Sequence, residues 1–258
     1  MKISVPWPVN PSSQIRIKEA LDLWENKNQL ILCLIEPCED PFIKKHQTFI
    51  LPRNSKSIGT KIAKPFIHDM VVASRDFSKS DYCGFGNSDC VPVGDIIEDH
   101  MDYEVLIYHR TDILKWEHRF KNNIGKPVNQ NTIDYIWTLR QQGNDDRKIA
   151  RHLNISGVKL PDGEKEWTYL VIRNILEDQG SVFFWGQDLY LFRKDIVDKV
   201  INNYLKIADP ILGTGGFDPR LTKWCLDNFK GARVLNKIFH LKHQSEWNCD
   251  EIEYKHNG

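Results

Sequence analysis

Residues 81–93 read DYCGFGNSDCVPV, and this stretch decides the predicted fold. Its apolar and aromatic residues 82–85 predict a short strand that stops at the polar triplet Asn-Ser-Asp. Open α/β sheets bind ligands at the carboxyl ends of their strands. In an extended backbone Asn87 and Asp89 would point to the same side. Two hard oxygens suit Mg²⁺ or Mn²⁺ already bound to a diphosphate. The alternative is a strand end closed by an Asx turn.

Charge and cysteine content exclude several broad classes. The 258-residue chain carries 35 Lys+Arg and 35 Asp+Glu, so no global field favours nucleic acid or a membrane, and any polyanion contact must be local. The 6 cysteines form no Cys-x-x-Cys pair. We find no signal peptide and no apolar run long enough to span a bilayer, and we therefore expect a reduced, cytoplasmic compartment.

The N-terminal half has the pattern of an α/β fold. A short strand at residues 3–5 ends in a proline-rich segment, after which Ser12 or Ser13 can cap a helix. The continuous apolar run 30–35 predicts a strand covered on both faces. Strand, helix and buried strand in this order predict the opening of a βαβ unit.

A basic loop follows the next short strand, at residues 48–51. The loop at residues 52–60 is rich in Arg, Lys, Asn, Ser and Gly, and Arg53 could contact a phosphate group there. The alternative is a solvated loop. A helix is expected at residues 65–77 and a further strand at residues 103–108.

The pattern becomes wholly helical after Pro127. Helices are expected near residues 132–139, 145–153 and 167–176. Their expected core consists of Ile136, Leu139, Ile149, Leu153, Val158, Trp167, Val171 and Ile175. Because an α/β pattern resumes afterwards, we interpret residues 128–178 as a three-helix module inserted between the two parts of one domain, residues 1–127 and 179–258.

The C-terminal part supplies further polar candidates. Two strands, at residues 181–185 and 189–192, flank Gly-Gln-Asp, and a helix is expected from residue 194 to 205. Asp218 is expected to cap a helix starting at Pro219. A last strand at residues 233–239 leads to two closely spaced histidines.

The outer chain resembles GT-A nucleotide-sugar glycosyltransferases of the small bacterial and phage type. The resemblance rests on a helix and strand ending in Asn-Ser-Asp (residues 65–89), a Gly-x-Asp-aromatic segment (residues 186–192) and a C-terminal histidine segment (residues 239–243). It implies a GT-A-like (Rossmann-type) mixed sheet flanked by helices. It also implies a UDP- or GDP-linked sugar donor. The usual triplet is Asp-x-Asp, so the asparagine in first place is a departure.

The resemblance also implies site residues. Asn87 and Asp89 would hold Mn²⁺ or Mg²⁺ on the donor diphosphate, with His240 or His243 as a further ligand. Asp188 would bind the acceptor and act as general base, its alternative being a turn aspartate. Arg110, after the strand at residues 103–108, would contact phosphate or sugar.

The insert resembles the small helical, helix-turn-helix-like domain of large serine recombinases. The match runs through residues 136–143, 148–158 and 167–176. It implies a DNA contact, for which the candidate side chains are Arg140, Arg147, Lys148, Arg151 and Arg173. Basic and acidic residues are equal in number between residues 129 and 177, so DNA contact needs the basic ones on one side. The alternative is a helical lid or protein-contact module.

Two functional hypotheses follow. The first is a glycosyltransferase that moves a sugar to an acceptor hydroxyl, either on a modified base in phage DNA or on a saccharide with the insert as lid. The second is a non-catalytic DNA-binding or regulatory protein on a transferase scaffold. No membrane partner is expected.

Overall fold

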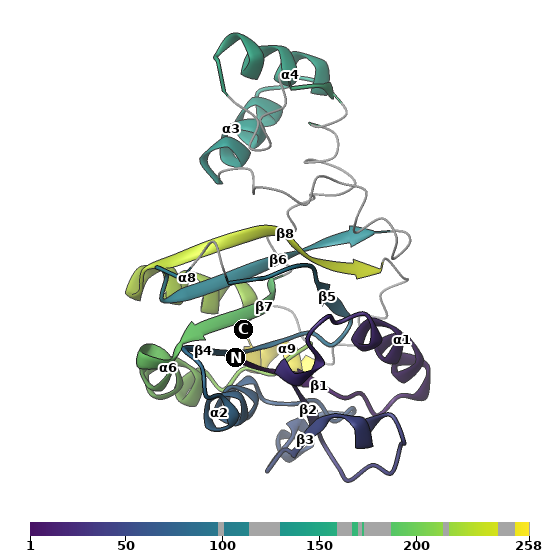
Figure 1. The fold of residues 1–258 in the computed structure, drawn as a ribbon. Helices are drawn as coiled ribbons and strands as arrows, with labels where there is room; N and C mark the ends of the chain where they lie inside the picture. The colour runs from purple at the N-terminus through teal and green to yellow at the C-terminus, as the bar shows by residue number, and fades with distance from the viewer. Residues whose placement is uncertain are drawn as a thin grey trace.

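The described strands form one mixed sheet, with helices around it (Figure 1). The computed structural model describes residues 1–97, 101–113, 130–158, 167–169, 172, 187–213, 217–241 and 251–257. The described strands lie side by side in the order β3-β2-β1-β4-β7-β6-β8-β5. No helix in these ranges is both long and apolar enough to cross a membrane.

The described elements have the following bounds. The strands are β1 (Lys2–Pro6), β2 (Leu30–Leu34), β3 (Gln47–Ile50), β4 (Tyr82–Gly86), β5 (Cys90–Pro92), β6 (Val105–Ile113), β7 (Gln187–Arg193) and β8 (Gly231–Leu241). The helices are α1 (Pro11–Asp22), α2 (Ile67–Phe77), α3 (Gln130–Gln141), α4 (Asp146–Ile155), α6 (Lys194–Val200), α7 (Lys206–Ala208), α8 (Phe217–Asn228) and α9 (Glu251–Asn257). Short 3₁₀ turns are η1 (Lys27–Gln29), η2 (Ile43–Lys45) and η3 (Ser55–Ile58), and η7 (Ile201–Leu205) is π-helical.

The N-terminal strands pair in parallel. β1 pairs with β2 and β4, and β2 pairs with β3, so α1 and α2 are crossover helices between parallel strands. This confirms the predicted βαβ opening. The predicted serine cap of α1 is wrong: Asn10 is the N-cap, and its side chain accepts from the Ser12 amide. Pro11 explains the shift, because a proline without an N–H fits the first helical position.

The remaining strands make the sheet mixed. β7 is antiparallel to both β4 and β6, β8 is parallel to β6, and β5 returns antiparallel to β8. The predicted fold class, an α/β mixed sheet flanked by helices, is therefore confirmed.

Helices cover both faces of the sheet, and each face has its own buried core. On one face Ile17 and Leu21 of α1, with Trp24 just after the helix, pack with alternate residues of β2. On the other face, α2, α6 and α8 pack against the remaining residues of β2, Ile31 and Cys33. The predicted burial of β2 on both sides is confirmed, since all its residues are buried.

Two glycines let β7 approach β4 closely. A Cβ on Gly84 would lie 1.9 Å from the Tyr190 carbonyl oxygen, and one on Gly86 would lie 2.9 Å from the carbonyl oxygen of Asp188. Next to them, Phe85 and Tyr190 stack with ring centroids 5.0 Å apart. Glycine is therefore required at residue 84 for this pairing.

The inserted helices have a separate small core. Ile136, Leu139, Ile149, Leu153 and Trp167 are buried together, with Val158 packed against them, as predicted. Figure 1 shows α3 and α4 lying apart from the sheet. Val171, Ile175, most of the third predicted helix and both predicted domain boundaries lie outside the described residues, so the three-domain division stays a prediction.

Three predictions for the C-terminal part need correction or extension. Asp188 lies within β7, so its interpretation as a turn aspartate is wrong. The helix from residue 194 changes at Ile201 into a π-helical turn. β8 is longer than expected because it pairs with β6 along nearly its whole length. The strand predicted at residues 181–185 lies outside the described residues.

We predict that Gly84→Ala destabilises the protein by about 3 kcal/mol or more. The added methyl group would clash with backbone atoms of Tyr190 and Leu191, which cannot move aside as a side chain could. Urea unfolding would measure the change. Gly143→Ala is the control: its φ is 84° but nothing lies within 4 Å, so we expect a loss of about 1 kcal/mol. Equal losses for the two variants would contradict the close approach of β7 to β4.

Candidate active site

The polar triplet after β4 forms a turn rather than an extension of the strand. β4 ends at Gly86, and the Cys90 amide donates to the Asn87 carbonyl at 3.5 Å. The expected alternation of residues 87 and 89 therefore does not apply. The Asn87 backbone amide donates to the Asp188 carbonyl at 2.8 Å, and the Asn87 side-chain amide donates to the Asp188 carboxylate. The turn is thus fixed to β7 by two contacts.

Asp89 meets the C-terminal histidine through the pairing of β5 with β8. Cys90 lies opposite His240 in this pairing, and His240 Nε2 is 3.4 Å from Asp89 Oδ2. The His240 side chain is 7% exposed and that of Asp89 is 22% exposed. The Trp24 indole donates to the Cys90 carbonyl at 3.1 Å and holds β5 from the side of α1. A carboxylate and an imidazole thus converge at the carboxyl end of β8.

A β-bulge places Asp188 near the carboxyl ends of β4 and β6. Tyr108 pairs with Leu189, but the next residue, His109, pairs with Gln187, so Asp188 is the extra residue in β7. A bulge bends its strand and redirects the extra side chain. Asp188 is 5% exposed, and its Oδ2 lies 3.6 Å from Arg110 Nε on β6. Asn87 and Arg110, both half-buried, therefore form one polar group with the buried Asp188.

Burial dominates the electrostatics of this group. It raises the pKa of the Asp188 carboxyl above its ordinary value, Arg110 and His240 oppose this rise, and Asp89 adds to it. A carboxyl whose pKa is raised by burial is suited to accepting a proton from a substrate hydroxyl.

Asp218 is a second carboxyl of this group, and sequence reasoning missed it. The predicted capping role is wrong, because α8 begins at Phe217 and Asp218 lies in its first turn. Its Oδ1 is buried, and no hydrogen-bond partner for that atom exists among the described residues. Burial raises the pKa of Asp218 well above its ordinary value, Asp188 adds to the rise, and Arg110 opposes it. The sequence feature that could have indicated a functional role for Asp218 is the segment Gly-Gly-Phe-Asp at residues 215–218.

The side chains at this site could hold a divalent cation only if a bound substrate supplied further ligands. Among the described residues, no three His, Cys, Asp or Glu side chains are grouped so as to hold a metal ion. Asp89 and His240 supply one oxygen and one nitrogen. The Asn87 amide that donates to Asp188 carries a further oxygen. Such a set suits Mg²⁺ or Mn²⁺ that takes its remaining ligands from a diphosphate and water.

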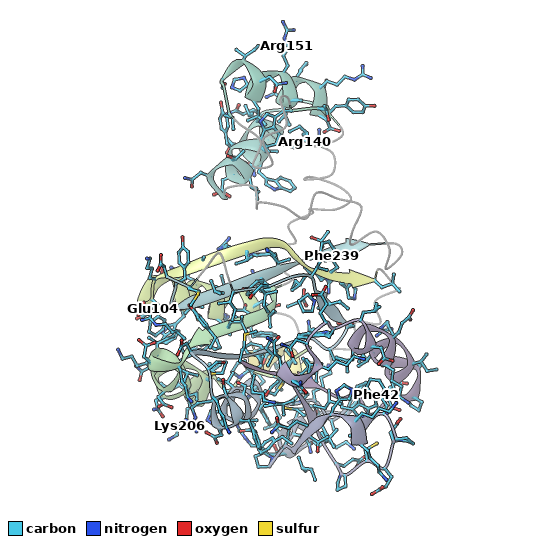
Figure 2. All side chains as sticks on the ribbon, viewed as in Figure 1. Phe42, Glu104, Arg140, Arg151, Lys206 and Phe239 are labelled. Atoms are coloured by element: carbon cyan, nitrogen blue, oxygen red, sulfur yellow. The ribbon has the colours of Figure 1, made fainter. Side chains whose placement is uncertain are left out.

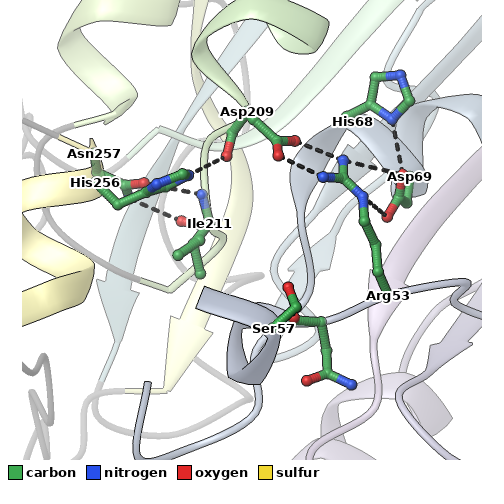
Figure 3. Close-up of polar contacts among 9 residues, drawn as sticks. Arg53, Ser57, His68, Asp69, Asp209, Ile211, His256 and Asn257 are labelled. Carbon is green, nitrogen blue, oxygen red and sulfur yellow. Dashed lines mark hydrogen bonds and ion pairs between the residues drawn. The ribbon is translucent and has the colours of Figure 1, made fainter. Parts of the chain in front are cut away.

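Arg53 lies in a different polar network (Figure 3). Its Nε donates to Asp69 at 2.9 Å, and its Nη2 donates to Asp209 at 2.6 Å. Pairing with Asp209 raises the pKa of the Arg53 guanidinium above its ordinary value. The phosphate contact predicted for Arg53 would have to replace one of these carboxylates.

The predicted nucleic-acid-binding residues of the insert differ in their exposure and ion pairing. Arg140 pairs with Asp146 at 3.0 Å, whereas Arg147, Lys148 and Arg151 are exposed on α4. The guanidinium of Arg147 also lies 5.4 Å from the ring centroid of Tyr169. Figure 2 shows Arg151 on the side of the helical pair that faces away from the sheet. Two further predicted site residues, Arg173 and His243, lie outside the described residues.

No family model and no curated protein matches the chain. Among solved structures, the chain is similar to S. aureus TarS 1-349 in complex with UDP-GlcNAc, with 15% identity, a TM-score of 0.49, and coverage of 99% of this chain and 64% of that chain. A second crystal structure of S. aureus TarS 1-349 gives 14% identity, a TM-score of 0.43 and coverage of 93% and 60%. The chain thus spans less than two thirds of that fragment. Similarity at this level identifies neither a reaction nor a ligand for this chain.

We predict that Asp218→Asn stabilises the protein at pH 8 and not at pH 4. Folding raises this pKa above the unfolded value of about 3.9. The carboxyl therefore destabilises the fold increasingly as pH rises from that value through its raised folded pKa. Thermal unfolding at the two pH values would measure the difference. Asp227→Asn, exposed on the same helix, is the control and should show no such gain. A gain for Asp218→Asn that is equal at both pH values would contradict a buried carboxyl.

Proposed function

We propose that this protein is a glycosyltransferase that moves a sugar from a nucleotide-sugar donor, UDP- or GDP-linked, to an acceptor hydroxyl. The observation that carries the proposal is the convergence of Asp89, His240, Asn87, Asp188 and Arg110 near the carboxyl ends of β4, β6 and β8. These side chains come from β6, β7, β8 and the turn after β4, and sugar transfer needs groups of these types.

The donor diphosphate would lie against Asp89 and His240. A divalent ion bound by these residues, with the amide oxygen of Asn87, would neutralise the charge that builds on the departing diphosphate. Arg110, whose side chain is 20% exposed, is placed to add positive charge beside the reacting groups. The role assigned to Arg53 in phosphate binding stays a proposal, since its guanidinium contacts Asp69 and Asp209.

Asp188 is the proposed general base. The acceptor oxygen forms a bond to the anomeric carbon, while the bond from that carbon to the diphosphate oxygen breaks and its electron pair leaves with the nucleoside diphosphate. The hydroxyl proton passes to the Asp188 carboxylate. The Asn87 amide holds this carboxylate in place, and burial of Asp188 favours the protonated product of the step.

The acceptor depends on the insert. The exposed basic side chains of α4 favour contact with DNA, and no acidic residue occurs from Arg147 to Val158. A hydroxymethylated base in phage DNA is then the acceptor, made accessible by flipping. With the insert as a lid, the acceptor is a saccharide.

The second candidate function is a non-catalytic DNA-binding or regulatory protein on a transferase scaffold. The same exposed side chains of Arg147, Lys148 and Arg151 favour it, since phosphate contacts dominate DNA affinity. Asn87 in place of the usual aspartate also favours it, because one carboxylate fewer weakens metal binding.

We predict that UDP or GDP with Mn²⁺ raises the melting temperature, and that Asp89→Ala removes the effect. Ligand at 100 times its Kd stabilises a protein by about 2.7 kcal/mol, which corresponds to a rise of roughly 5–10 °C for a chain of this size. A thermal-shift panel of nucleoside diphosphates and sugar nucleotides, with and without Mn²⁺, would measure it. The control is Asp76→Ala, an exposed aspartate at the end of α2, which should keep the full shift.

An unchanged melting temperature with every nucleotide in this panel would contradict the transferase proposal. If the same protein is retained on DNA in a salt-sensitive manner, and Arg151→Ala weakens that retention, the second candidate stands instead.

A further inference from the structure

The C-terminal helix α9 is bound to the loop that follows α7. The buried Asn257 side chain accepts from the Ile211 amide at 3.0 Å and donates to the Ile211 carbonyl at 3.0 Å. Its neighbour His256 places Nε2 2.8 Å from the Asp209 carbonyl oxygen, and Arg220 donates to the Asn257 carbonyl at 3.3 Å. One end of α9 thus contacts the backbone at both Asp209 and Ile211 (Figure 3).

The same helix is next to the basic loop after β3. Ile252 Cδ1 would lie 3.7 Å from a Cβ on Gly59, and the His256 ring lies edge-on to Phe66 with centroids 6.0 Å apart. Arg53 stacks on that same Phe66 ring, 4.3 Å from its centroid. Helix α9 therefore bridges two loops, residues 52–60 and residues 209–213.

The Asp209 carboxylate binds the Arg53 guanidinium in the way that a bound phosphate would. Both Asp209 oxygens bond to the guanidinium, Oδ2 to Nη1 at 2.5 Å and Oδ1 to Nη2 at 2.6 Å. This forked pairing is the geometry in which arginine also binds phosphate. With Asp69 on Nε, two carboxylates surround one guanidinium, and their negative charge opposes a further anion.

The arrangement of Asp209 depends on its neighbours. Asp209 ends α7 with φ 44°, a left-handed cap conformation in which its amide donates to the Leu205 carbonyl at 2.9 Å, and His256 of α9 contacts the carbonyl of the same residue. Helix α9 has 7 residues, too few to be stable alone, so it stays folded through its contacts with the two loops and with Arg220 of α8. Elements of this kind open at low free-energy cost.

We propose that α9 is an autoinhibitory strap: when docked, it holds Asp209 on Arg53, and when released, it frees the Arg53 guanidinium for a diphosphate-type anion. The proposal rests on the proposed function in so far as the anion belongs to a nucleotide donor. By linkage, an anion bound at Arg53 favours release of α9 to the same extent that release favours the anion.

The test compares Asn257→Ala with Asn203→Ala, an exposed asparagine on η7 that serves as the matched control. Both variants should fold, as judged by thermal unfolding. We expect amide hydrogen exchange at Ile211 and in residues 251–257 to accelerate in Asn257→Ala and to stay unchanged in Asn203→Ala. Unchanged exchange in Asn257→Ala would overturn the strap.

Binding of inorganic pyrophosphate, measured by calorimetry, tests the inhibition. We expect Asn257→Ala to bind it about fivefold or more tightly than the unaltered protein, the lower end of coupling between protein sites. Adding Arg53→Lys, which keeps the charge but removes the fork, should abolish the gain.

Two results would overturn the inhibitory role: faster exchange with unchanged or weaker pyrophosphate binding, or a gain that survives Arg53→Lys. Neither readout uses Asp89, a metal ion or a sugar donor. Failure here therefore leaves the transferase proposal standing, and failure of the nucleotide panel leaves the strap testable.

Discussion

The close approach of β7 to β4 is the constraint on which the rest of the structure depends. Gly84 and Gly86 leave no side chain between the two strands, and the Phe85–Tyr190 stack fixes them together. The β7 bulge then places the Asp188 carboxylate against the Asn87 amide. With a side chain at residue 84, the strands would separate, and the groups that we assign to the reaction would no longer meet.

The site that results is costly to keep folded. Asp188 and the carboxyl of Asp218 are withdrawn from water, with Arg110 as the nearby cation, and burial raises the pKa of both carboxyls. A purely structural core would not need two such groups, since apolar residues would fill the same space at lower cost. Asp188 also lies within electrostatic reach of Asp89 and His240, and perturbed carboxyls of this kind cluster at functional sites.

Sequence reasoning reached what depends on local pattern. Apolar runs and helix signals are short-range, so the βαβ opening, the burial of β2 and the small core of the insert could be predicted. The bulge at Asp188 could not, because it arises from pairing with β6, about 80 residues away in sequence. For the same reason, the pairing of Arg53 with Asp209 could not be predicted from the local sequence, because Asp209 lies 156 residues further along the chain. Asp218 was assigned to a cap because its helix boundary was placed two residues too late.

The most direct measurement is anomalous diffraction from crystals grown with Mn²⁺ and UDP or GDP. We expect one manganese peak about 2.0–2.2 Å from an Asp89 carboxylate oxygen and from His240 Nε2, with the diphosphate bound to the same ion. A nucleotide bound with its metal ion elsewhere, or bound in this chain away from Asp89 and Asp188, would contradict the proposal that these strands form a sugar-transfer site.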